Sequence, residues 1–449
     1  MIGDLEGPVA RLDDAGRIIT DDFTLEWGVL AGDRWRLAHD ERLRRSRVDD
    51  TPVYEQWLRV PGGDVILRTG VINDGVGRAL VLEFDNASSS AVMVALAGHR
   101  AGISLQADTD MVLAAGEPWI RPARSAGALA VGDEIWEAVA AEPGADPAVG
   151  DGSAALLLAV PHRQSVKVMV AVEGPMPNRD QTPAEIAAGW RAVAGRALDI
   201  ELPDAELTEA WRQVICDLIV EAGSNDPLAA AEAAWWLDLA GLADEADRGR
   251  GVLVAAAENG ELTSDAAVAG LRALAGRDLI VGERSGIDQL ADVLSALAGE
   301  DLDAETLELT ADALEPTDPR AAKDARRLAA RVAKTGVVYR GPHSRVGRGA
   351  ATVLGSVVAG HMHGRRLQLL PTVADDWHGQ PIDVRGLATA VGSVSFSVRW
   401  HGDRPALLWE RIGGSDTVEI RCPGLDPEWC STERSGEALL APPATPATS

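Results

Sequence analysis

Residues 367–410 read LQLLPTVADDWHGQPIDVRGLATAVGSVSFSVRWHGDRPALLWE, and this stretch decides the fold class of the C-terminal part of the chain. Near its end, apolar residues fill every second position: Val394, Phe396, Val398 and Trp400. This alternation is the pattern of a β-strand with one buried face. The turn formers that follow predict a second strand over 406–410. We therefore expect an antiparallel hairpin with Trp400 on its buried face.

Three stretches resemble one known family. Residues 367–410 follow the order LP, W-x-G-x-P-I-x-V-x-G-L and V-S-F-x-V-R-W-H-G-x-R-P-A-L-L-W-E. This order is similar to the C-terminal β-segment of bacterial six-hairpin glycosidases, the glucoamylase-like proteins. Residues 189–212 (GWRAVAGRALDIELPDAELTEAWR) resemble the connector between the N-terminal supersandwich and the helical domain of that family. Residues 226–262 (DPLAAAEAAWWLDLAGLADEADRGRGVLVAAAENGEL) resemble one helical hairpin of its (α/α)6 toroid.

The resemblance implies a multidomain α and β protein. Its parts would be an N-terminal antiparallel β-sandwich (supersandwich), a domain of α/α helical hairpins and a C-terminal β-segment. The resemblance covers residues 182–245 and 340–410, and extends to the N-terminal part only by architecture. It also implies carbohydrate as the ligand. The family uses two carboxylic acids, one that protonates the leaving oxygen and one that activates water or attacks the sugar.

The composition is that of a large, acidic, globular chain. Its 449 residues suit two or three domains, and 46% hydrophobic residues are too many for a disordered protein. The net charge of −27 disfavours nucleic acid and anionic lipid as partners. Neither a membrane span nor a signal peptide is expected. The sparse cysteines suit a cytoplasmic location, although Cys422 could pair with Cys430 if the chain were exported; the third is Cys216.

The N-terminal part is predicted to be β-structure. Residues 15–175 contain many short strand patterns separated by Gly, Pro and Asp, as in an antiparallel sandwich. The pattern changes at 182–185, where the sequence TPAE is typical of a helix start with a capping box. We assign 1–181 to the β-sandwich and 182–203 to a connector helix and strand.

Residues 204–335 are predicted to be an α-helical hairpin domain. Apolar residues recur at helical spacing in seven segments: 205–223, 227–243, 246–259, 264–275, 287–299, 303–314 and 319–334. A full (α/α)6 toroid has twelve helices, and these need roughly 200 residues with their connections. Only 132 residues lie between 204 and 335, so the domain is expected to be truncated.

Strand patterns return over residues 336–430, the predicted C-terminal β-segment. The expected strands are 336–339, 351–358, 366–370, 382–384, 394–400, 406–410 and 417–422. The last segment, 431–449, is rich in Pro, Ala and Thr and is predicted to be a disordered tail.

The resemblance places catalytic acids on loops of the helical domain. The candidates there are Glu258, Glu261, Asp265, Glu283, Asp301 and Asp303. None of them has the aromatic neighbours that such sites usually have, and helix capping or solvation accounts for all six. The catalytic acid and base therefore stay unassigned.

Tryptophan is the preferred aromatic residue, with 13 Trp against 3 Phe and 2 Tyr. Its flat face packs on sugar C–H groups while its N–H donates a hydrogen bond. The candidate substrate-binding residues are Trp377, in the loop PTVADDWHGQP, and the neighbours Trp235 and Trp236. Adjacent positions on a helix point about 100° apart, so one of the pair should pack and the other line a groove. The alternative is that each Trp fills the core in place of Phe or Tyr.

No cofactor or metal is expected. His361 and His363 would share one face of a strand, and Asp375, Asp376 and His378 follow, but only the two histidines are well placed by spacing. The sequence lacks G-x-S-x-G, H-E-x-x-H and C-x-x-C, and it has no G-x-G-x-x-G after a strand. Hydrolase-elbow, zinc-protease, redox and dinucleotide functions therefore have no support.

Two functions remain open. The first is a catalytically degenerate glycoside hydrolase-like protein that binds a carbohydrate or a protein partner, which the shortened helical domain favours. The alternative is an active glycoside hydrolase that uses two carboxylic acids on helical-domain loops. The expected ligand is a glycan, without nucleic acid or membrane, and a homo-oligomer is left open.

Overall fold

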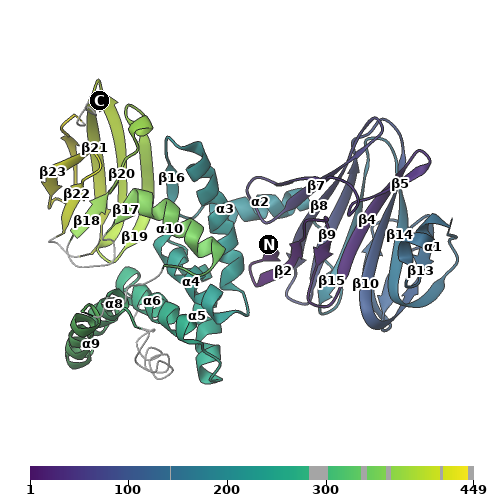
Figure 1. The fold of residues 1–449 in the computed structure, drawn as a ribbon, viewed down its shortest axis with the longest axis horizontal. Helices are drawn as coiled ribbons and strands as arrows, with labels where there is room; N and C mark the ends of the chain where they lie inside the picture. Colours follow the sequence, from purple (N-terminus) through teal and green to yellow (C-terminus); the bar gives the residue numbers. More distant parts are fainter. Residues whose placement is uncertain (142, 283–301, 335–340, 360–365, 415–417, 443–449) are drawn as a thin grey trace. The chain divides into compact units, whose positions relative to one another are not determined.

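The computed structural model describes residues 1–449 except 142, 283–301, 335–340, 360–365, 415–417 and 443–449. The chain divides into two compact units (Figure 1). The N-terminal unit comprises Met1–Asp4 and Pro8–Ala192, and the C-terminal unit comprises Leu5–Gly7 and Val193–Ser449. The helices of the predicted α/α domain and the strands of the predicted β-segment therefore belong to one compact unit.

A single 15-stranded sheet forms most of the N-terminal unit. Its main path runs β1-β2-β3-β4-β10-β11-β12-β15-β9-β8-β7-β6. Off this path, β5 pairs with β4, β14 pairs with β10, and β13 pairs with β14. The strands are β1 (Ile2–Asp4), β2 (Gly7–Leu12), β3 (Ile18–Ile19), β4 (Thr24–Ala31), β5 (Arg34–Leu37), β6 (Arg44–Arg47), β7 (Tyr54–Val60), β8 (Gly63–Asn73), β9 (Arg78–Asn86), β10 (Val92–Ala107), β11 (Val112–Ala114), β12 (Glu117–Pro122), β13 (Ala128–Val131), β14 (Ala148–Val160) and β15 (Ser165–Glu173).

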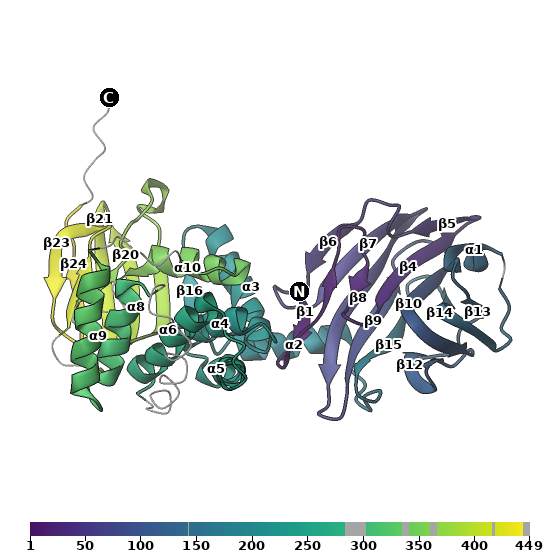
Figure 2. The ribbon, with the colours of Figure 1, turned by 60° about the horizontal axis from the view of Figure 1, so that its bottom comes forward.

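The sheet curls over on itself, as Figures 1 and 2 show, and its long strands pair antiparallel. Side chains of β4, β10 and β14 share one core with side chains of β8, β9 and β15. Trp27 lies in this core with its ring 5.8 Å from that of Phe84, and Trp119 lies 5.4 Å from Phe23. The predicted sandwich is therefore present as two layers of one continuous sheet.

The connector helix begins as the sequence predicts. In α2 (Pro183–Ala194), the carboxylate of Glu185 accepts the N–H of Thr182 at 2.8 Å, and the Thr182 hydroxyl accepts the N–H of Glu185 at 3.3 Å. This reciprocal pair is the capping box. Ile186 and Trp190, which lie one turn apart, are buried.

Six described helices lie between residues 204 and 335: α3 (Ala205–Ala222), α4 (Pro227–Leu239), α5 (Ala243–Glu258), α6 (Ser264–Ile280), α8 (Ala304–Leu314) and α9 (Pro319–Val332). They match six of the seven predicted helices, and the seventh, 287–299, lies outside the described residues. Side-chain oxygens cap the N-termini of all but α5: Asp204, Asp226, Thr263, Asp303 and Asp318.

A buried ionic network joins α4, α5 and α6. The side chain of Asp238 on α4 is fully buried; its Oδ2 lies 2.6 Å from Nη1 of Arg250, and its Oδ1 lies 3.5 Å from Nη1 of Arg277. Asp247 on α5 pairs with both arginines. Burial raises the pKa of Asp238 to about 6, while the two arginines act in the opposite direction. Because an unpaired buried charge is strongly destabilising, the network fixes how these three helices pack.

The C-terminal strands form two sheets, ordered β16-β19-β20-β21-β24 and β17-β18-β22-β23. Their strands are β16 (Asp199–Glu201), β17 (Val358–Ala359), β18 (Arg366–Leu369), β19 (Ile382–Thr389), β20 (Gly392–His401), β21 (Arg404–Ile412), β22 (Glu419–Cys422), β23 (Asp426–Ser431) and β24 (Ser435–Leu439). The hairpin predicted from residues 394–410 is confirmed as β20 and β21, which pair antiparallel with Phe396 opposite Trp409.

Two segments differ from the prediction. Residues 351–358, expected as a strand, belong almost entirely to the helix α10 (Arg345–Val357). Ser344 caps this helix by accepting the N–H of Gly347 at 2.8 Å, and its buried residues recur at helical spacing. Residues 435–439, inside the predicted disordered tail, form β24, because their backbone groups pair with β21 at the edge of the sheet.

The predicted burial of Trp400 is wrong. Val394, Phe396 and Val398 are buried, but Trp400 is only half-buried at the end of β20. Its indole N–H donates to the carbonyl of Gln380 at 2.8 Å, and its ring lies 5.7 Å from that of His378. The strand leaves the core before its last residues, so the alternation continues there without burial.

Within the described ranges, no helix combines the length and the apolar character that a membrane crossing needs. None of the three cysteines forms a disulfide: Cys216 and Cys422 are buried, and Cys430 is exposed. Burial raises the pKa of Cys422 to about 12, so this thiol is unreactive as a nucleophile.

Alanine substitutions in β20 test this register. Phe396 is 3% exposed, so Phe396→Ala should lower the free energy of unfolding by about 3–5 kcal/mol through loss of burial and a residual cavity. Trp400→Ala should cost less than half as much, because the ring is already in contact with water. Denaturant unfolding of both variants measures the difference, and equal losses would show that the core extends to residue 400.

Candidate functional site

Buried carboxyl groups gather where α3, α4 and the start of α10 meet. Glu221 lies in the last turn of α3 and Glu232 lies in the middle of α4; they are 6% and 3% exposed. His343 and Ser344 immediately precede α10, which packs on both other helices. We call Glu221, Glu232, His343 and Ser344 the α3–α4–α10 cluster.

Glu232 holds the start of α10 in place. Its Oε1 accepts the backbone N–H of His343 at 2.6 Å, and its Oε2 accepts the backbone N–H of Ser344 at 2.9 Å. These are charge-assisted bonds to the N-terminus of a helix, where the macrodipole also favours a negative charge. A Cβ at Gly347 would lie 3.0 Å from Oε2 of Glu232 and 2.8 Å from Pro342, so glycine leaves room for the carboxylate.

The same carboxylate orients the imidazole of His343. Nδ1 of His343 lies 3.2 Å from Oε1 of Glu232, an arrangement that favours a hydrogen on Nδ1 and leaves Nε2 as an acceptor. Nε2 lies 3.9 Å from the carboxylate of Asp265, at the start of α6. The His343 side chain is 42% exposed, so Nε2 can exchange protons with water or a ligand.

Glu221 carries a proton at neutral pH for a substantial part of the time. Its pKa is raised to about 7, and burial is the largest cause. A hydrogen bond from Ser344 acts in the opposite direction, while nearby Asp217, Glu232 and Asp226 act in the same direction as burial. Its Oε2 has no hydrogen-bond partner among the described residues. The cluster thus joins a carboxyl group that titrates near neutrality to an oriented imidazole, which is the equipment of general acid–base chemistry.

The predicted substrate-binding tryptophans lie in different settings. Trp235 is 5% exposed, with the guanidinium of Arg272 5.0 Å from its ring centre. Trp236 is half-buried and lies on α4 one turn after Glu232. Trp377 is 6% exposed, in the short 3-10 helix Asp375–Trp377. Sugar binding by these three residues stays a prediction, and Trp236 is the one with the most accessible ring.

The candidate catalytic acids that lie among the described residues do not converge. Asp303 is buried as the N-cap of α8, where its carboxylate accepts the N–H of Thr306 at 2.9 Å. Glu258, Glu261 and Asp265 are exposed, and only Asp265 approaches the α3–α4–α10 cluster. Glu283 and Asp301 lie outside the described residues, as do His361 and His363. Across the part of the chain that is described, no three His, Cys, Asp or Glu side chains are placed to hold a metal ion.

Sequence reasoning missed the cluster, although a signal was present. Glu232 interrupts the run LAAAEAAWW, and Glu221 ends the run LIVEA. A lone acid among residues that are otherwise apolar signals a buried carboxyl group, because Glu is seldom fully buried without a partner. The partners themselves could not be inferred, since His343 is 111 residues from Glu232.

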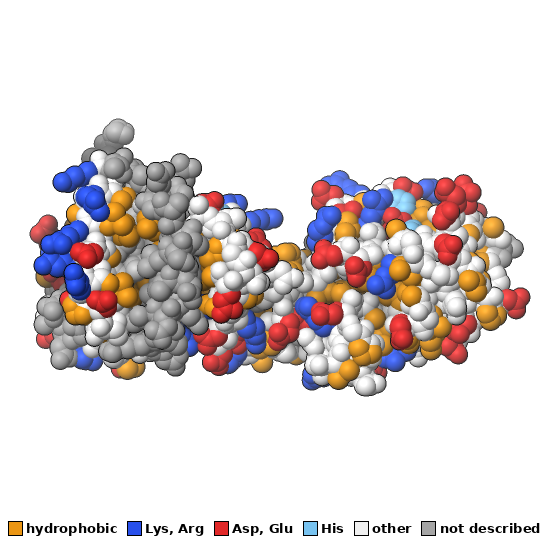
Figure 3. Space-filling view, turned by 90° about the horizontal axis from the view of Figure 1, so that it is seen from below, with side chains coloured by type: hydrophobic (Ala, Val, Ile, Leu, Met, Phe, Trp, Pro, Cys, Tyr) orange, Lys and Arg blue, Asp and Glu red, His pale blue; other side chains and the backbone are white. Residues whose placement is uncertain are grey.

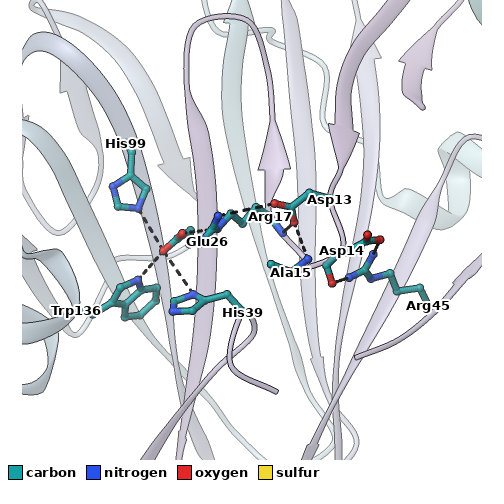
Figure 4. A network of polar contacts seen from close by, with 9 residues as sticks. All are labelled: Asp13, Asp14, Ala15, Arg17, Glu26, His39, Arg45, His99 and Trp136. Carbon is teal, nitrogen blue, oxygen red and sulfur yellow. Dashed lines mark hydrogen bonds and ion pairs between the residues drawn. The ribbon is translucent and has the colours of Figure 1, made fainter. Parts of the chain in front are cut away.

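A second polar network lies in the N-terminal unit and is centred on Glu26 of β4 (Figure 4). Its carboxylate accepts the indole N–H of Trp136 at 2.7 Å and pairs with Arg17 at 2.8 Å. His39 and His99 approach the same carboxylate at 3.6 and 3.5 Å. The contact with His99 is the largest cause that lowers the pKa of Glu26 to about 2. Because Trp136 belongs to α1 (Ile135–Ala140), we interpret the network as structural: it attaches this helix to the sheet.

Comparisons with known proteins give distant likenesses to solved structures. No family model and no curated protein matches the chain. Among solved structures, a bacterial glucoamylase complexed with acarbose matches at 12% identity and a TM-score of 0.47, over 74% of this chain and 67% of that one. A TPR-domain containing protein from Parabacteroides distasonis matches at 10% identity and a TM-score of 0.16, over 73% and 78%. At these levels neither match assigns a family, a substrate or a catalytic residue.

Removing the titrating carboxyl of Glu221 should change how stability depends on pH. A folded-state pKa of about 7 lies above the ordinary value of 4.5, so Glu221 destabilises the fold as pH rises from 4.5 through 7. Glu221→Gln should therefore raise the free energy of unfolding by about 3 kcal/mol at pH 8 and change it little at pH 4. Denaturant unfolding at both pH values measures this, with Glu209→Gln, on the exposed side of α3, as the control. An effect of equal size at both pH values would show that the carboxyl does not titrate near neutrality.

Glu26 should have the opposite pH dependence. Its folded-state pKa is lowered to about 2. Its contribution to the free energy of unfolding is therefore complete well above pH 4.5, the ordinary pKa, and is lost as pH falls toward 2. Glu26→Gln should lower the free energy of unfolding by about 3 kcal/mol at pH 7, and the gap between variant and wild type should narrow from pH 5 to pH 2. Urea unfolding across that range checks the trend, and a gap that stays constant would contradict it.

Proposed function

We propose that the protein acts on a glycan by proton transfer at the α3–α4–α10 cluster. One observation carries the proposal: a buried carboxyl group, Glu221, titrates at about 7 in the same cluster as an imidazole that a second buried carboxylate orients. A general acid is most effective when its pKa lies near the working pH, and burial is the usual way in which proteins raise that of a glutamate.

Three members of the cluster have separate roles in this proposal. Glu221 donates its proton to the oxygen of the leaving group. His343 accepts a proton from water at Nε2, which is the nitrogen left without hydrogen when Nδ1 donates to Glu232. Glu232 is a positioning residue, since its oxygens are engaged by the start of α10 and it acts on the substrate only through His343.

A glycan is proposed as the substrate on two grounds. Residues 182–245 and 340–410 resemble six-hairpin glycosidases in their sequence patterns, and α4 lies within the first of these ranges. In addition, Trp236 is half-buried one turn along α4 from Glu232, on the same side of the helix. An indole in that position offers a flat face for a sugar ring beside the acid–base pair.

Binding without turnover is the second candidate. It is favoured by the burial of Glu221, which is 6% exposed, and by the engagement of both Glu232 oxygens in holding α10. In that case the cluster would stabilise the helix junction, and a glycan would bind without being cleaved.

Turnover on a panel of aryl glycosides decides between the two candidates. If Glu221 is the acid, kcat/KM should fall as pH rises through about 7, because the deprotonated carboxylate cannot donate. Glu221→Gln and His343→Gln should each lower kcat by 10²-fold or more, which is the usual contribution of a general acid or base.

The control for these variants is Glu209→Gln, which makes the same chemical change on the exposed side of α3. Turnover that is unaffected by the two cluster variants would place the chemistry elsewhere. No turnover on any glycoside, together with a rise in Tm when a glycan is added, would establish binding without catalysis.

A further inference from the structure

A large excess of positive charge lies on and just after α9. Residues 319–334 contain six cations and one acid, Asp324, for a net charge of +5; the cations are Arg320, Lys323, Arg326, Arg327, Arg331 and Lys334. Since the whole chain carries −27, the remainder carries −27 − 5 = −32. Two of the three lysines of the protein fall in these sixteen residues.

Four of these cations form a row along one side of the helix. Arg320, Lys323, Arg327 and Arg331 follow one another at intervals of three, four and four residues, and all four are exposed. This spacing places them on one face of a helix, and we call them the α9 stripe. On the opposite face, Ala322 and Ala329 are buried and α9 packs on α8. Basic side chains gather at the left edge of Figure 3, where α9 lies in Figure 1.

Helix stability accounts only for the end of the α9 stripe, where the macrodipole favours Arg331 in the last turn. Lys323, Arg327 and Arg331 are successive i, i+4 neighbours of like charge, which destabilises a helix. Arg327 contacts Asp324 at 3.2 Å, but both side chains are mostly exposed, and such pairs contribute little. By contrast, Arg326, which lies off the stripe, pairs with Asp312 and Glu315 of the α8 end and does tie the two helices together. A stripe kept at a cost to the helix points to a ligand.

We propose that the α9 stripe binds a linear carboxylated polysaccharide, a chain of uronic acid residues. The exposed face of a helix is convex and cannot enclose a small anion, but it can lie along an extended polyanion. Neighbouring cations of the stripe lie about 5–6 Å apart along the helix, which is comparable with the advance of one sugar residue in an extended chain. Each uronate would then place one carboxylate beside one cation.

Nucleic acid fits the α9 stripe less well. Single-strand binding relies on aromatic side chains on which bases stack, and residues 319–334 contain no Trp, Tyr or Phe. Duplex DNA carries a phosphate charge about every 1.7 Å, which the remaining charge of −32 would repel more strongly than the sparser carboxylates of a polyuronate. The proposal is independent of the acid–base function, because the α9 stripe would bind the polymer whether or not Glu221 takes part in cleaving it.

Binding of a fluorescently labelled oligogalacturonate, followed by anisotropy at several salt concentrations, tests the proposal. The full chain should bind at low salt, and the variant Lys323→Gln/Arg327→Gln/Arg331→Gln should bind at least about tenfold more weakly, because three surface charge pairs are lost. The slope of log K against log salt should fall by about 2 in magnitude when three contacts are removed.

The matched control is Arg11→Gln/Arg34→Gln/Arg42→Gln, which removes the same charge from exposed positions of the N-terminal unit. This control should bind within about twofold of wild type, and so should Glu221→Gln, which leaves the α9 stripe intact. Equal losses of affinity in the two triple variants would show that binding depends only on net charge, and this would overturn the proposal. Tighter binding of an oligothymidylate than of the oligogalacturonate, or no binding of the oligogalacturonate at low salt, would also overturn it.

Discussion

The contact between Glu232 and the start of α10 is the interaction on which the C-terminal unit depends. The Glu232 carboxylate is buried and would be very costly to bury alone. Here it is stabilised by the N–H groups of His343 and Ser344 and by the imidazole of His343. The contact joins segments 111 residues apart. It fixes the orientation of His343, requires a glycine at position 347, and adds a negative charge that raises the pKa of Glu221. One buried charge therefore produces both the helix junction and the candidate site.

Helix α4 carries two such buried charges, and they serve different neighbours. Glu232 and Asp238 are six residues apart, so they project from different sides of the helix. Glu232 contacts the start of α10, whereas Asp238 pairs with Arg250 of α5 and Arg277 of α6. The rest of α4 is rich in Ala, Trp and Leu and is buried nearly all round, as expected for a central helix. Apolar packing would tolerate several rotations of α4, but two directional polar contacts on different sides allow only one.

Local patterns were sufficient to predict much of the fold. The capping box at Thr182 and Glu185, six helix positions and the β20–β21 hairpin follow from spacing and turn chemistry alone. The failures share a cause, which is that tertiary contacts override local preference. Residues 351–357 include Thr352, Val353 and Val357, which favour strands, yet they form a helix because Ser344 caps it and α3 and α4 cover its apolar side. Residues 435–439 have little strand preference, and they become β24 because the edge of β21 offers them hydrogen-bond partners.

The candidate site could be predicted only in part for a related reason. A lone glutamate in an apolar helix indicates a buried carboxyl, but its chemistry depends on what lies beside it, and that is set by the packing of three helices. Glu221 and Glu26 illustrate the point, since both are shielded glutamates with ordinary pKa values of 4.5. Glu26 is surrounded by donors and its pKa falls to about 2, whereas Glu221 is buried more deeply, beside three acidic neighbours, and its pKa rises to about 7. The acidity of the chain therefore has local consequences. Acidic neighbours help Glu221 to keep its proton at neutral pH. The same acidity makes the α9 stripe stand out as the surface that favours an anionic polymer.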